Sequence, residues 1–584
     1  MNGTNKADRT FFSLLSPRDI TGFDLSGNSE NDLDIEFIAK NISANKAEQK
    51  AITKILLNMP DNIGVIDYRK AIYSDLRDHY DICERMYDTF DSLRFFVSDR
   101  TNHIDEGSTI YELLTRLKSL ENYIISIYRL KEVVDGVDFR SEGMKQFAEM
   151  IQHIYNDSGF EELKNDIGII SDEISNVRSL TIGVNLNSNF YPVESGIISL
   201  NSYWFTEQSA LKNFLKYHRK DRINDKDLMP FNIETHEDSL NKSVKKFRYL
   251  IASKDSMAAS VADYTASDSP LMNNLNKIIE RMLPSMTGKL KKVLYKYVDI
   301  SGTALGELAD EVLFYLRFIE LERKLTDAGM PCCCGEDSDN DTVFSDIYNV
   351  KLAICKLNGT IEDEIVCNDI EFTNDKTVQI LTGPNRGGKT ILTQGIGLAF
   401  LLYQSGVFVP ARSASVKLCS GIYTHFPVEE ERTVSLGRLG EEAARFCEIS
   451  KSADSESLVL LNESFATTSH TESLYIAEDA IKYLCCVGAR TIFNTHMHEL
   501  AAEADTFGET EGAVCKAVSM VMENNNGERS YKVSYKSPDG KSYAHEIAYN
   551  FGITFEQLMG EYNSRGGNSR VDTDNDIQND VQTQ

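Results

Sequence analysis

The chain has 584 residues, of which 41% are hydrophobic and 26% are charged, and its formal net charge is −28 at pH 7. That length exceeds one ordinary hydrophobic core and predicts about three or four domains. We find neither a secretory signal nor an apolar run of the about 20 residues that a membrane span requires, so we expect a soluble, cytoplasmic protein. Nucleic acid phosphate repels so acidic a protein as a whole, and any contact with DNA must therefore use local basic patches.

The first half of the chain is predicted to be mainly helical. Residues 1–34 are polar and irregular, whereas apolar side chains in residues 35–330 recur mostly at the spacing of amphipathic helices. The clearest helices are expected at 109–134 and 303–327, and short strands are expected at 179–186 and 197–200.

A different pattern follows in the second half. Residues 331–342 are expected to form a linker. Over residues 343–562, apolar strand-like runs alternate with helical patterns, which is typical of an α/β nucleotide-binding domain. Residues 563–584 are polar and contain no aromatic side chain, so we expect a disordered tail. The predicted fold class is therefore mixed, with a largely α-helical region followed by an α/β domain.

The most specific pattern lies at residues 383–390, which match G-x-x-x-x-G-K-[ST] at every fixed position. A strand-like run precedes this loop, and a helix-like run at 391–403 follows it. Glycines let backbone N–H groups converge on phosphate oxygens, and the helix N-terminus adds partial positive charge. Lys389 is expected to reach the β- and γ-phosphates of ATP, and the Thr390 hydroxyl is expected to hold Mg²⁺. The predicted nucleotide-binding residues are Gly383, Pro384, Asn385, Arg386, Gly387, Gly388, Lys389, Thr390 and Ile391.

A second strand-like run, Leu458–Leu461, ends in Asn462 and Glu463 and resembles a Walker B strand. Glu463 is expected to orient or deprotonate the attacking water. Asn462 stands where a Walker B strand normally carries aspartate. Its amide oxygen can accept a hydrogen bond from a Mg²⁺-bound water, but it brings no negative charge. We therefore expect Mg²⁺ to be held less strongly, which is a reason to expect weak hydrolysis.

A third strand-like run, Thr491–Thr495, leads directly to His496. A histidine at a strand end is most often a packed or solvated side chain. In ATPases of the ABC class, however, a histidine at this place contacts the γ-phosphate and senses its loss, and the segment Asn494–Leu500 favours that role. The expected catalytic residues are Glu463, His496 and Lys389.

These motifs together resemble the MutS family of DNA mismatch repair ATPases. Thr382–Thr390 is similar to the family's phosphate loop, TGPNMGGKS, in which the Pro-Asn pair after the first glycine is distinctive. Thr491–Leu500 is similar to the family's FATHYHEL segment. Further similar segments are Asp67–Arg69 in a helical run at 63–76, the GxxVPA-like Gly406–Ala411, Thr467–Glu472 at the place of the D-loop, and Lys541–Tyr543.

The resemblance implies a core and lever region over 35–330 and an ABC-type ATPase domain over 343–562. It also implies a homodimer that encloses two ATP molecules at its interface. We expect no counterpart of the family's N-terminal mismatch-reading domain in this sequence. Phe160–Glu162 has the letters of that domain's wedge motif, but we expect it to lie in a surface helix.

Two positions depart from the family's pattern. The segment Ser435–Glu442 stands in place of the Ser-Thr-Phe signature. Ser435 and Gly437 are expected either to meet the γ-phosphate bound by the partner subunit or to form an ordinary turn before a helix. The position of the family's adenine-stacking aromatic falls near Ile365, so we expect lower nucleotide affinity or stacking by another residue.

Contact with DNA would use basic clusters of the helical region, which neutralise phosphate without reading sequence. The candidate residues are Lys212, Lys216, Arg219, Lys245, Lys246, Lys289, Lys291 and Lys292. Such runs are also common on solvated helix faces, and that alternative stays open.

The sequence favours an ATPase that couples ATP binding and hydrolysis to a dimer rearrangement on mismatched, branched or damaged DNA, in repair or recombination. One alternative is an ATP-gated dimeric interaction module with negligible hydrolysis, which Asn462 and the altered signature favour. Another is an ATPase that acts on a different partner without contact to DNA, which the acidic charge favours.

Overall fold

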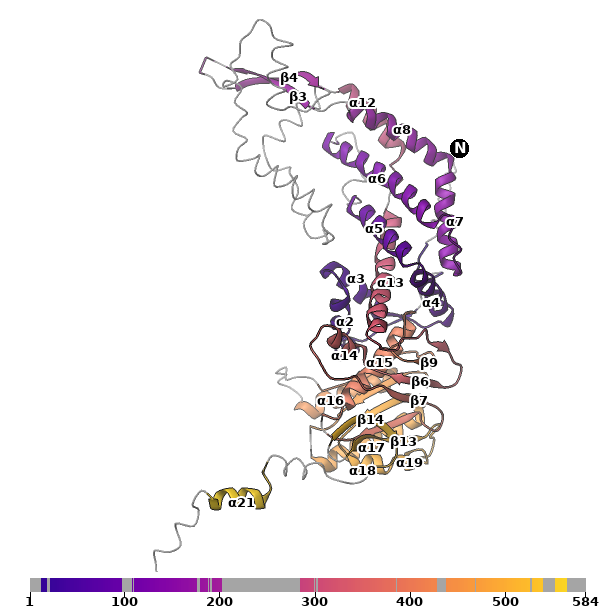
Figure 1. Cartoon of the computed structure of the whole chain (residues 1–584), viewed down its shortest axis with the longest axis vertical. Helices are drawn as coiled ribbons and strands as arrows, with labels where there is room; N and C mark the ends of the chain where they lie inside the picture. The colour runs from indigo at the N-terminus through magenta and orange to yellow at the C-terminus, as the bar shows by residue number, and fades with distance from the viewer. Residues whose placement is uncertain are drawn as a thin grey trace, which may run out of the picture. The chain divides into compact units, whose positions relative to one another are not determined.

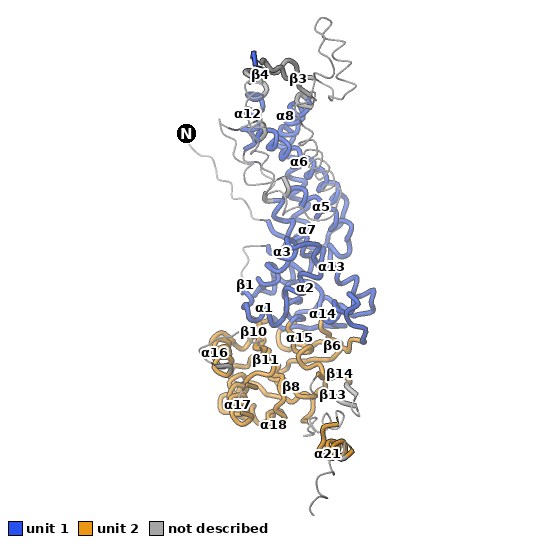
Figure 2. Tube along the Cα trace, turned by 90° about the vertical axis from the view of Figure 1, so that its left-hand side faces the viewer, with its two compact units in different colours: residues 1–337, 350–363, 398–418 blue, residues 338–349, 364–397, 419–584 orange. Residues whose placement is uncertain are grey.

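The computed structural model (Figure 1) divides the chain into two compact units, which Figure 2 shows in separate colours. Unit 1 comprises residues 1–337, 350–363 and 398–418, and unit 2 comprises residues 338–349, 364–397 and 419–584. The residues that the structure describes are 12–17, 22–96, 108, 110–175, 179–186, 188–189, 192–201, 284–298, 300, 303–384, 386–427, 437–467, 469–525, 528–538 and 552–564. Both units therefore combine segments from distant parts of the sequence.

Unit 1 is mainly helical. Its helices are α1 (Gly27–Leu33), α2 (Ile35–Ile42), α3 (Lys46–Leu57), α4 (Ile63–Asp78), α5 (Tyr80–Phe96), α6 (Ile110–Val134), α7 (Glu142–Asn156), α8 (Ser158–Ser175), α12 (Pro284–Lys296), α13 (Thr303–Asp327) and α14 (Val350–Leu357). The long helices α6 and α13 confirm the predictions at 109–134 and 303–327. Helix α13 packs against α5, and α6 packs against α7, α8 and α12 (Figure 1). The predicted strands are present as an antiparallel hairpin of β3 (Ser179–Leu186) and β4 (Pro192–Asn201).

Buried hydrogen bonds fasten the N-terminal segment 12–17 to α4 and α13. The Arg69 guanidinium, only 1% exposed, donates from Nε to the Leu15 carbonyl at 2.8 Å. The Tyr315 hydroxyl donates to the Leu14 carbonyl at 2.8 Å. Because a buried polar group without a partner is costly, these bonds specify where the segment lies.

Residues 1–34 were expected to be irregular, but their described part contains regular structure. Strand β1 (Gly22–Asp24) pairs antiparallel with β2 (Asn58–Pro60). Helix α1 follows, and the side chain of its N-cap residue Ser26 accepts a hydrogen bond from the Ser29 N–H. The partner of β1 is distant in the sequence, so local composition does not reveal the pairing.

The segment 331–342, expected as a linker, also forms long-range pairs. Strand β5 (Glu336–Asp337) pairs parallel with β9 (Ser413–Val416). Cys333 and Val409 exchange two backbone hydrogen bonds, of 3.1 and 2.7 Å. Paired backbone groups, rather than side-chain pattern, order this segment.

Phe160 supports the expectation that Phe160–Glu162 lies in a helix. It is in α8 and is only 5% exposed. Its ring packs near those of Tyr123, Tyr128 and Tyr155, with centroids 6.1–6.4 Å away. Phe160 thus packs in the core of the helical unit, while Glu161 and Glu162 are exposed, as expected for a helix at the surface.

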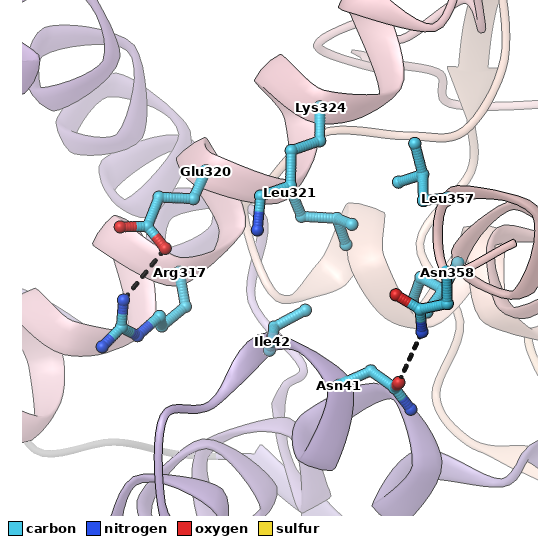
Figure 3. A pocket seen from close by; sticks show the side chains of 9 residues that line it. Asn41, Ile42, Arg317, Glu320, Leu321, Lys324, Leu357 and Asn358 are labelled. Carbon is cyan, nitrogen blue, oxygen red and sulfur yellow. Dashed lines mark hydrogen bonds and ion pairs between the residues drawn. The ribbon is translucent and has the colours of Figure 1, made fainter. Parts of the chain in front are cut away.

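A small pocket in unit 1 lies among α2, α13 and α14 (Figure 3). Its lining residues are Asn41, Ile42, Arg317, Glu320, Leu321, Lys324, Ile354, Leu357 and Asn358. Arg317 pairs with Glu320 at 2.9 Å and with Glu48 at 2.9 Å, and the Asn358 amide donates to Asn41 at 2.8 Å. Most of its polar groups therefore satisfy one another, and we assign it no ligand.

Unit 2 is an α/β unit. Its strands are β6 (Thr342–Ile347), β7 (Asn368–Phe372), β8 (Val378–Thr382), β10 (Ile422–His425), β11 (Leu458–Asn462), β12 (Arg490–Asn494), β13 (Ala517–Asn525) and β14 (Glu528–Tyr535). Its helices are α16 (Gly437–Ser452), α17 (His470–Val487), α18 (His498–Ala502), α19 (Ala504–Phe507) and α21 (Phe555–Ser564), and α15 (Lys389–Gln404) begins in unit 2 and ends in unit 1. Together, the helical and α/β units confirm the mixed fold class predicted from the sequence.

A six-stranded sheet forms the centre of unit 2, in the order β10-β11-β12-β8-β13-β14. The first five strands run parallel, and β14 joins β13 antiparallel. Every residue of β8, β11 and β12 is buried, as in parallel sheets covered on both faces. Asn462 is in register with Asn494, which is in register with Leu381, so β11 and β12 end together and β8 ends one residue further.

None of the helices in the described part of the chain is both long enough and apolar enough to cross a lipid bilayer.

Gly406 provides a test of packing in unit 1. It has φ +77°, and a Cβ at this position would lie 2.3 Å from the Arg69 Cβ. Gly359 has a similar φ of +70° but open space around it. Alanine should cost about 1–2 kcal/mol at either position because of the left-handed backbone. Gly406→Ala should cost a further ~1–3 kcal/mol because of the clash.

Denaturant unfolding of Gly406→Ala and Gly359→Ala measures the difference directly. Equal losses in the free energy of unfolding would contradict the close approach of Gly406 to Arg69.

Candidate functional site

The loop from Gly383 to Lys389 connects the central strand β8 to α15. Arg386 and Gly388 have φ of 60° and 90°, which bend the loop sharply between strand and helix. A Cβ on Gly388 would lie 3.2 Å from the ring of Tyr531, so only glycine fits there without displacing that ring. Ile391 lies in the first turn of α15, and Asn385 lies outside the described residues. The local fold is thus the strand, loop and helix that the sequence predicted.

Lys389 folds back over this loop. Its side chain is buried, and Nζ donates to the carbonyls of Gly383 and Pro384 at 3.1 and 3.3 Å. Burial lowers the pKa of Lys389, and the negative charge of Glu463 acts in the opposite direction. Among the described residues, the ammonium group donates to neutral backbone carbonyls, and a negatively charged phosphate would be a stronger hydrogen-bond acceptor.

Asn462 joins the loop to two other elements. Its Oδ1 accepts a hydrogen bond of 3.0 Å from the Thr390 hydroxyl on α15. The same oxygen accepts a short hydrogen bond from Nδ2 of Asn494, at the end of β12. Asn494 is fully buried, and its own Oδ1 has no hydrogen-bond partner among the described residues. Three neighbouring chain segments therefore meet at one amide oxygen.

Thr390 and Asn462 fit a magnesium ion in donor chemistry. Both offer the oxygen ligands that Mg²⁺ prefers, and their side chains are in direct contact. The strand end supplies an amide instead of a carboxylate, so this pair offers no negative charge to the cation.

Glu463 follows Asn462 and adopts a left-handed backbone with φ 51°. Its N–H donates to the Asn494 carbonyl at 2.8 Å, and its Oε1 lies 2.7 Å from Nε2 of His496. The hydrogen bond from His496 lowers the pKa of Glu463, against the opposing effect of burial. Both side chains remain partly exposed, at 36% and 41%. An ionised carboxylate within reach of solvent is what a group that accepts a proton from water requires.

The structure therefore brings together five of the expected site residues, which are Lys389, Thr390, Asn462, Glu463 and His496. Of the expected signature residues, Gly437 is the first residue of α16, and Ser435 lies outside the described residues.

Most of the candidate DNA-binding residues are also outside the described residues, namely Lys212, Lys216, Arg219, Lys245 and Lys246. Lys289, Lys291 and Lys292 lie on α12, where Lys289 and Lys292 are exposed. Their neighbour Lys296 forms ion pairs with Glu162 and Asp166 of α8, so part of the charge of this cluster is balanced within the unit.

Two residues of the candidate site, Asn494 and Tyr531, were not predicted from the sequence. Asn494 stands where the family's FATHYHEL segment has alanine, and this difference could have indicated a polar contact at this position. Tyr531 on β14 gave no signal, because only the sheet brings it to the phosphate loop, where its ring approaches Gly388. Tyr531 itself has φ 54° and is 41% exposed, whereas Ile365, at the expected aromatic position, has no ring.

Two families match the chain: MutS domain V over residues 379–558 and MutS2 N-terminal domain over residues 61–328. A DNA mismatch repair protein MutS from Prochlorococcus marinus (strain AS9601) is 24% identical over 485 residues, which are 82% of this chain and 46% of that protein. An Endonuclease MutS2 from Streptococcus equi subsp. equi (strain 4047) is 34% identical over 189 residues, 32% of this chain and 24% of that protein. Another Endonuclease MutS2, from Streptococcus suis (strain 05ZYH33), is 24% identical over 433 residues, 70% of this chain and 53% of that protein. The chain thus spans about half or less of the length of these relatives.

Asn462→Asp is expected to strengthen Mg²⁺ binding in the presence of ATP. The donors from Thr390 and Asn494 already face Oδ1 and would pair equally well with a carboxylate oxygen, while the added charge attracts the cation. At contact distance such a charge is worth several kcal/mol, so the half-saturating Mg²⁺ concentration should fall at least about tenfold. Asn462→Ala removes the acceptor and should raise that concentration.

Calorimetric titrations of ATP at a series of Mg²⁺ concentrations measure this order of affinities. An identical Mg²⁺ dependence in all three proteins would show that Asn462 does not face the metal.

Proposed function

The chain belongs to the MutS family, and on that premise we propose that it binds ATP with Mg²⁺, hydrolyses it, and couples its nucleotide state to DNA binding. The observation that carries the proposal is the convergence of Lys389, Asn462, Glu463 and His496 at the ends of three adjacent parallel strands. Nucleotides bind at this edge in open α/β sheets, outside the carboxyl ends of the strands.

Phosphate recognition falls to the loop and to Lys389. Backbone N–H groups at the start of α15 and the helix N-terminus attract the triphosphate. The Lys389 ammonium exchanges its carbonyl partners for β- and γ-phosphate oxygens. Thr390 and Asn462 hold Mg²⁺, which when bound neutralises charge on the phosphates.

Hydrolysis falls to Glu463 and His496. A water oxygen attacks the γ-phosphorus, the bond from that phosphorus to the β,γ-bridging oxygen breaks, and Glu463 accepts the proton of the water. His496 holds Oε1 of Glu463 at 2.7 Å and keeps the carboxylate ionised. A histidine beside the γ-phosphate also loses a partner when that phosphate leaves, which makes His496 a sensor of hydrolysis.

The proposed binding partners are a second copy of the chain and DNA. Ser435 and Gly437 precede or begin α16 and would present a hydroxyl and an N–H to the nucleotide of the partner subunit. The name of one relative, DNA mismatch repair protein MutS, supports DNA as a partner. Lysines of α12 offer positive charge for phosphate in an otherwise acidic chain.

Wild-type protein is expected to hydrolyse ATP faster than Lys389→Ala. Glu463→Gln should bind ATP with unchanged affinity but lose about 10²–10⁴-fold in kcat, because the carboxylate acts on water and not on ATP binding. Phosphate release assays with all three proteins test this. A wild-type hydrolysis rate equal to that of Lys389→Ala would contradict the proposed ATPase activity. The alternative function would then be an ATP-gated interaction module, which the replacement of the Walker B aspartate by Asn462 also favours.

Tyr531 is expected to stack on the adenine. Tyr531→Ala should weaken ATP binding by about tenfold or more, since stacking on an aromatic ring is worth ~1–3 kcal/mol, whereas Tyr531→Phe should keep the affinity. Inorganic tripolyphosphate has no base and serves as the control ligand, because its affinity should be the same in all three proteins. Equal losses of affinity for ATP and tripolyphosphate would show that Tyr531 maintains the conformation of the phosphate loop and does not stack on the adenine.

DNA binding is expected to weaken with salt, with a slope that reflects the number of phosphates contacted. The double variant Lys289→Ala and Lys292→Ala should reduce that slope by about 1–2. Lys118→Ala on α6 is the matched control, because this exposed lysine pairs with Glu121 on its own helix. Absence of binding to duplex and branched DNA at low salt would contradict the proposed DNA binding. An unchanged salt dependence in the double variant would show that α12 does not contact DNA.

A further inference from the structure

The turn that carries Glu463 is held in a demanding conformation. Glu463 and Phe465 have φ of 51° and 66°, so two side-chain-bearing residues flanking Ser464 are left-handed. Such residues cost of the order of 1–3 kcal/mol each and persist only where the surrounding structure enforces them. The contacts that enforce this turn therefore decide where the Glu463 carboxylate lies.

His425, at the end of β10, holds the middle of the turn. Its ring is buried, with Nδ1 lying 2.7 Å from the Ser464 hydroxyl and Nε2 lying 3.1 Å from the Glu442 carbonyl of α16. A carbonyl only accepts, so Nε2 carries the proton and Nδ1 is an acceptor. The Ser464 hydroxyl donates to Nδ1 at 2.7 Å, and the His425 carbonyl, at 3.2 Å, is a longer second acceptor for the same proton. Burial, with the nearby charge of Arg445, lowers the pKa of His425 to about 4, so the neutral ring keeps this arrangement at physiological pH.

Phe465 anchors the end of the turn in the core of unit 2. Its side chain is 1% exposed, and its ring lies 5.7 Å from that of His425 and 5.5 Å, edge to face, from that of Phe446 on α16. The Ser473 hydroxyl of α17 donates to the Phe465 carbonyl at 2.6 Å. The turn is therefore held by contacts with α16 and α17.

Arg445 fixes α16 to the same strand end. Its guanidinium donates to the carbonyls of Thr424 and Phe426, both at 3.0 Å, on either side of His425. Strand β10, helix α16 and the turn after β11 thus form one connected polar cluster around the imidazole.

We propose that His425 is a positioning residue for Glu463, which it holds through Ser464 while linking the turn to α16 through the Glu442 carbonyl. The inference rests on the proposed hydrolysis and deepens it. Helix α16 begins at Gly437, in the segment expected to meet the nucleotide of a second copy. A shift of α16 on dimer closure therefore reaches the catalytic carboxylate through His425.

Two substitutions of His425 distinguish its hydrogen bond with Ser464 from its hydrogen bond with Glu442. His425→Asn places an amide oxygen near the Nδ1 position and keeps the acceptor for Ser464. His425→Gln reaches to the Nε2 position and keeps the donor to Glu442, but it loses that acceptor. Ser464→Ala removes the other partner with little change in volume and serves as the second test where a ring substitution unfolds the protein.

The experiment measures kcat, ATP affinity by calorimetry and the melting temperature of each variant. His425→Gln and Ser464→Ala are expected to lower kcat about tenfold or more with ATP affinity unchanged, since a misplaced catalytic group costs up to about 10²-fold. Their combination should be no worse than either alone, and His425→Asn should recover most of the loss. A structural role alone predicts instead that kcat follows the melting temperature and that the asparagine variant gives no rescue.

The outcomes distinguish this inference from the function it rests on. Wild-type hydrolysis together with normal kcat in His425→Gln and Ser464→Ala overturns the inference alone. A wild-type rate at the level of Lys389→Ala overturns the inference and the proposed hydrolysis together.

Discussion

The register of three parallel strands decides where every polar group of the candidate site lies. Because β11 and β12 end together and β8 ends one residue further, Asn462, Asn494 and the phosphate loop that follows Thr382 become neighbours. Their strands are buried on both faces, so a slip of one residue would reverse the face on which each side chain packs and would draw the polar residues at the strand ends into the sheet. The hydrophobic core of unit 2 thus enforces the geometry of the site, and the polar contacts refine it.

The sequence predicted the parts that local pattern specifies. The phosphate loop has a fixed glycine and lysine spacing, and the strands before Asn462 and His496 are short apolar runs, so each was recognisable alone. The order of these motifs also indicated the MutS family, which the family matches confirm. Long amphipathic helices such as α6 and α13 were predictable for the same reason, since their periodicity extends over 25 residues.

What the sequence did not reveal depends on pairing between distant residues. Asn494 reaches Asn462 across 32 residues, and His425 reaches Ser464 across 39 residues. Tyr531 reaches the phosphate loop only because β13 and β14 extend the sheet past β8. No local stretch of sequence specifies strand order and register. The hydrogen bonds of Asn494 and His425 could therefore not be predicted before the sheet was known. The two amides also differ from the family's motifs, because Asn462 stands in place of a Walker B aspartate and Asn494 in place of an alanine.

The central claim is that the loop around Lys389 binds the triphosphate of ATP. Isothermal titration calorimetry of folded wild-type protein and Lys389→Ala with ATP in the presence of Mg²⁺ tests it most directly. Saturable heat from one ATP per chain is expected for the wild-type protein, and loss of that heat is expected for Lys389→Ala. Absence of heat from wild-type protein that is folded by an independent measure would contradict it.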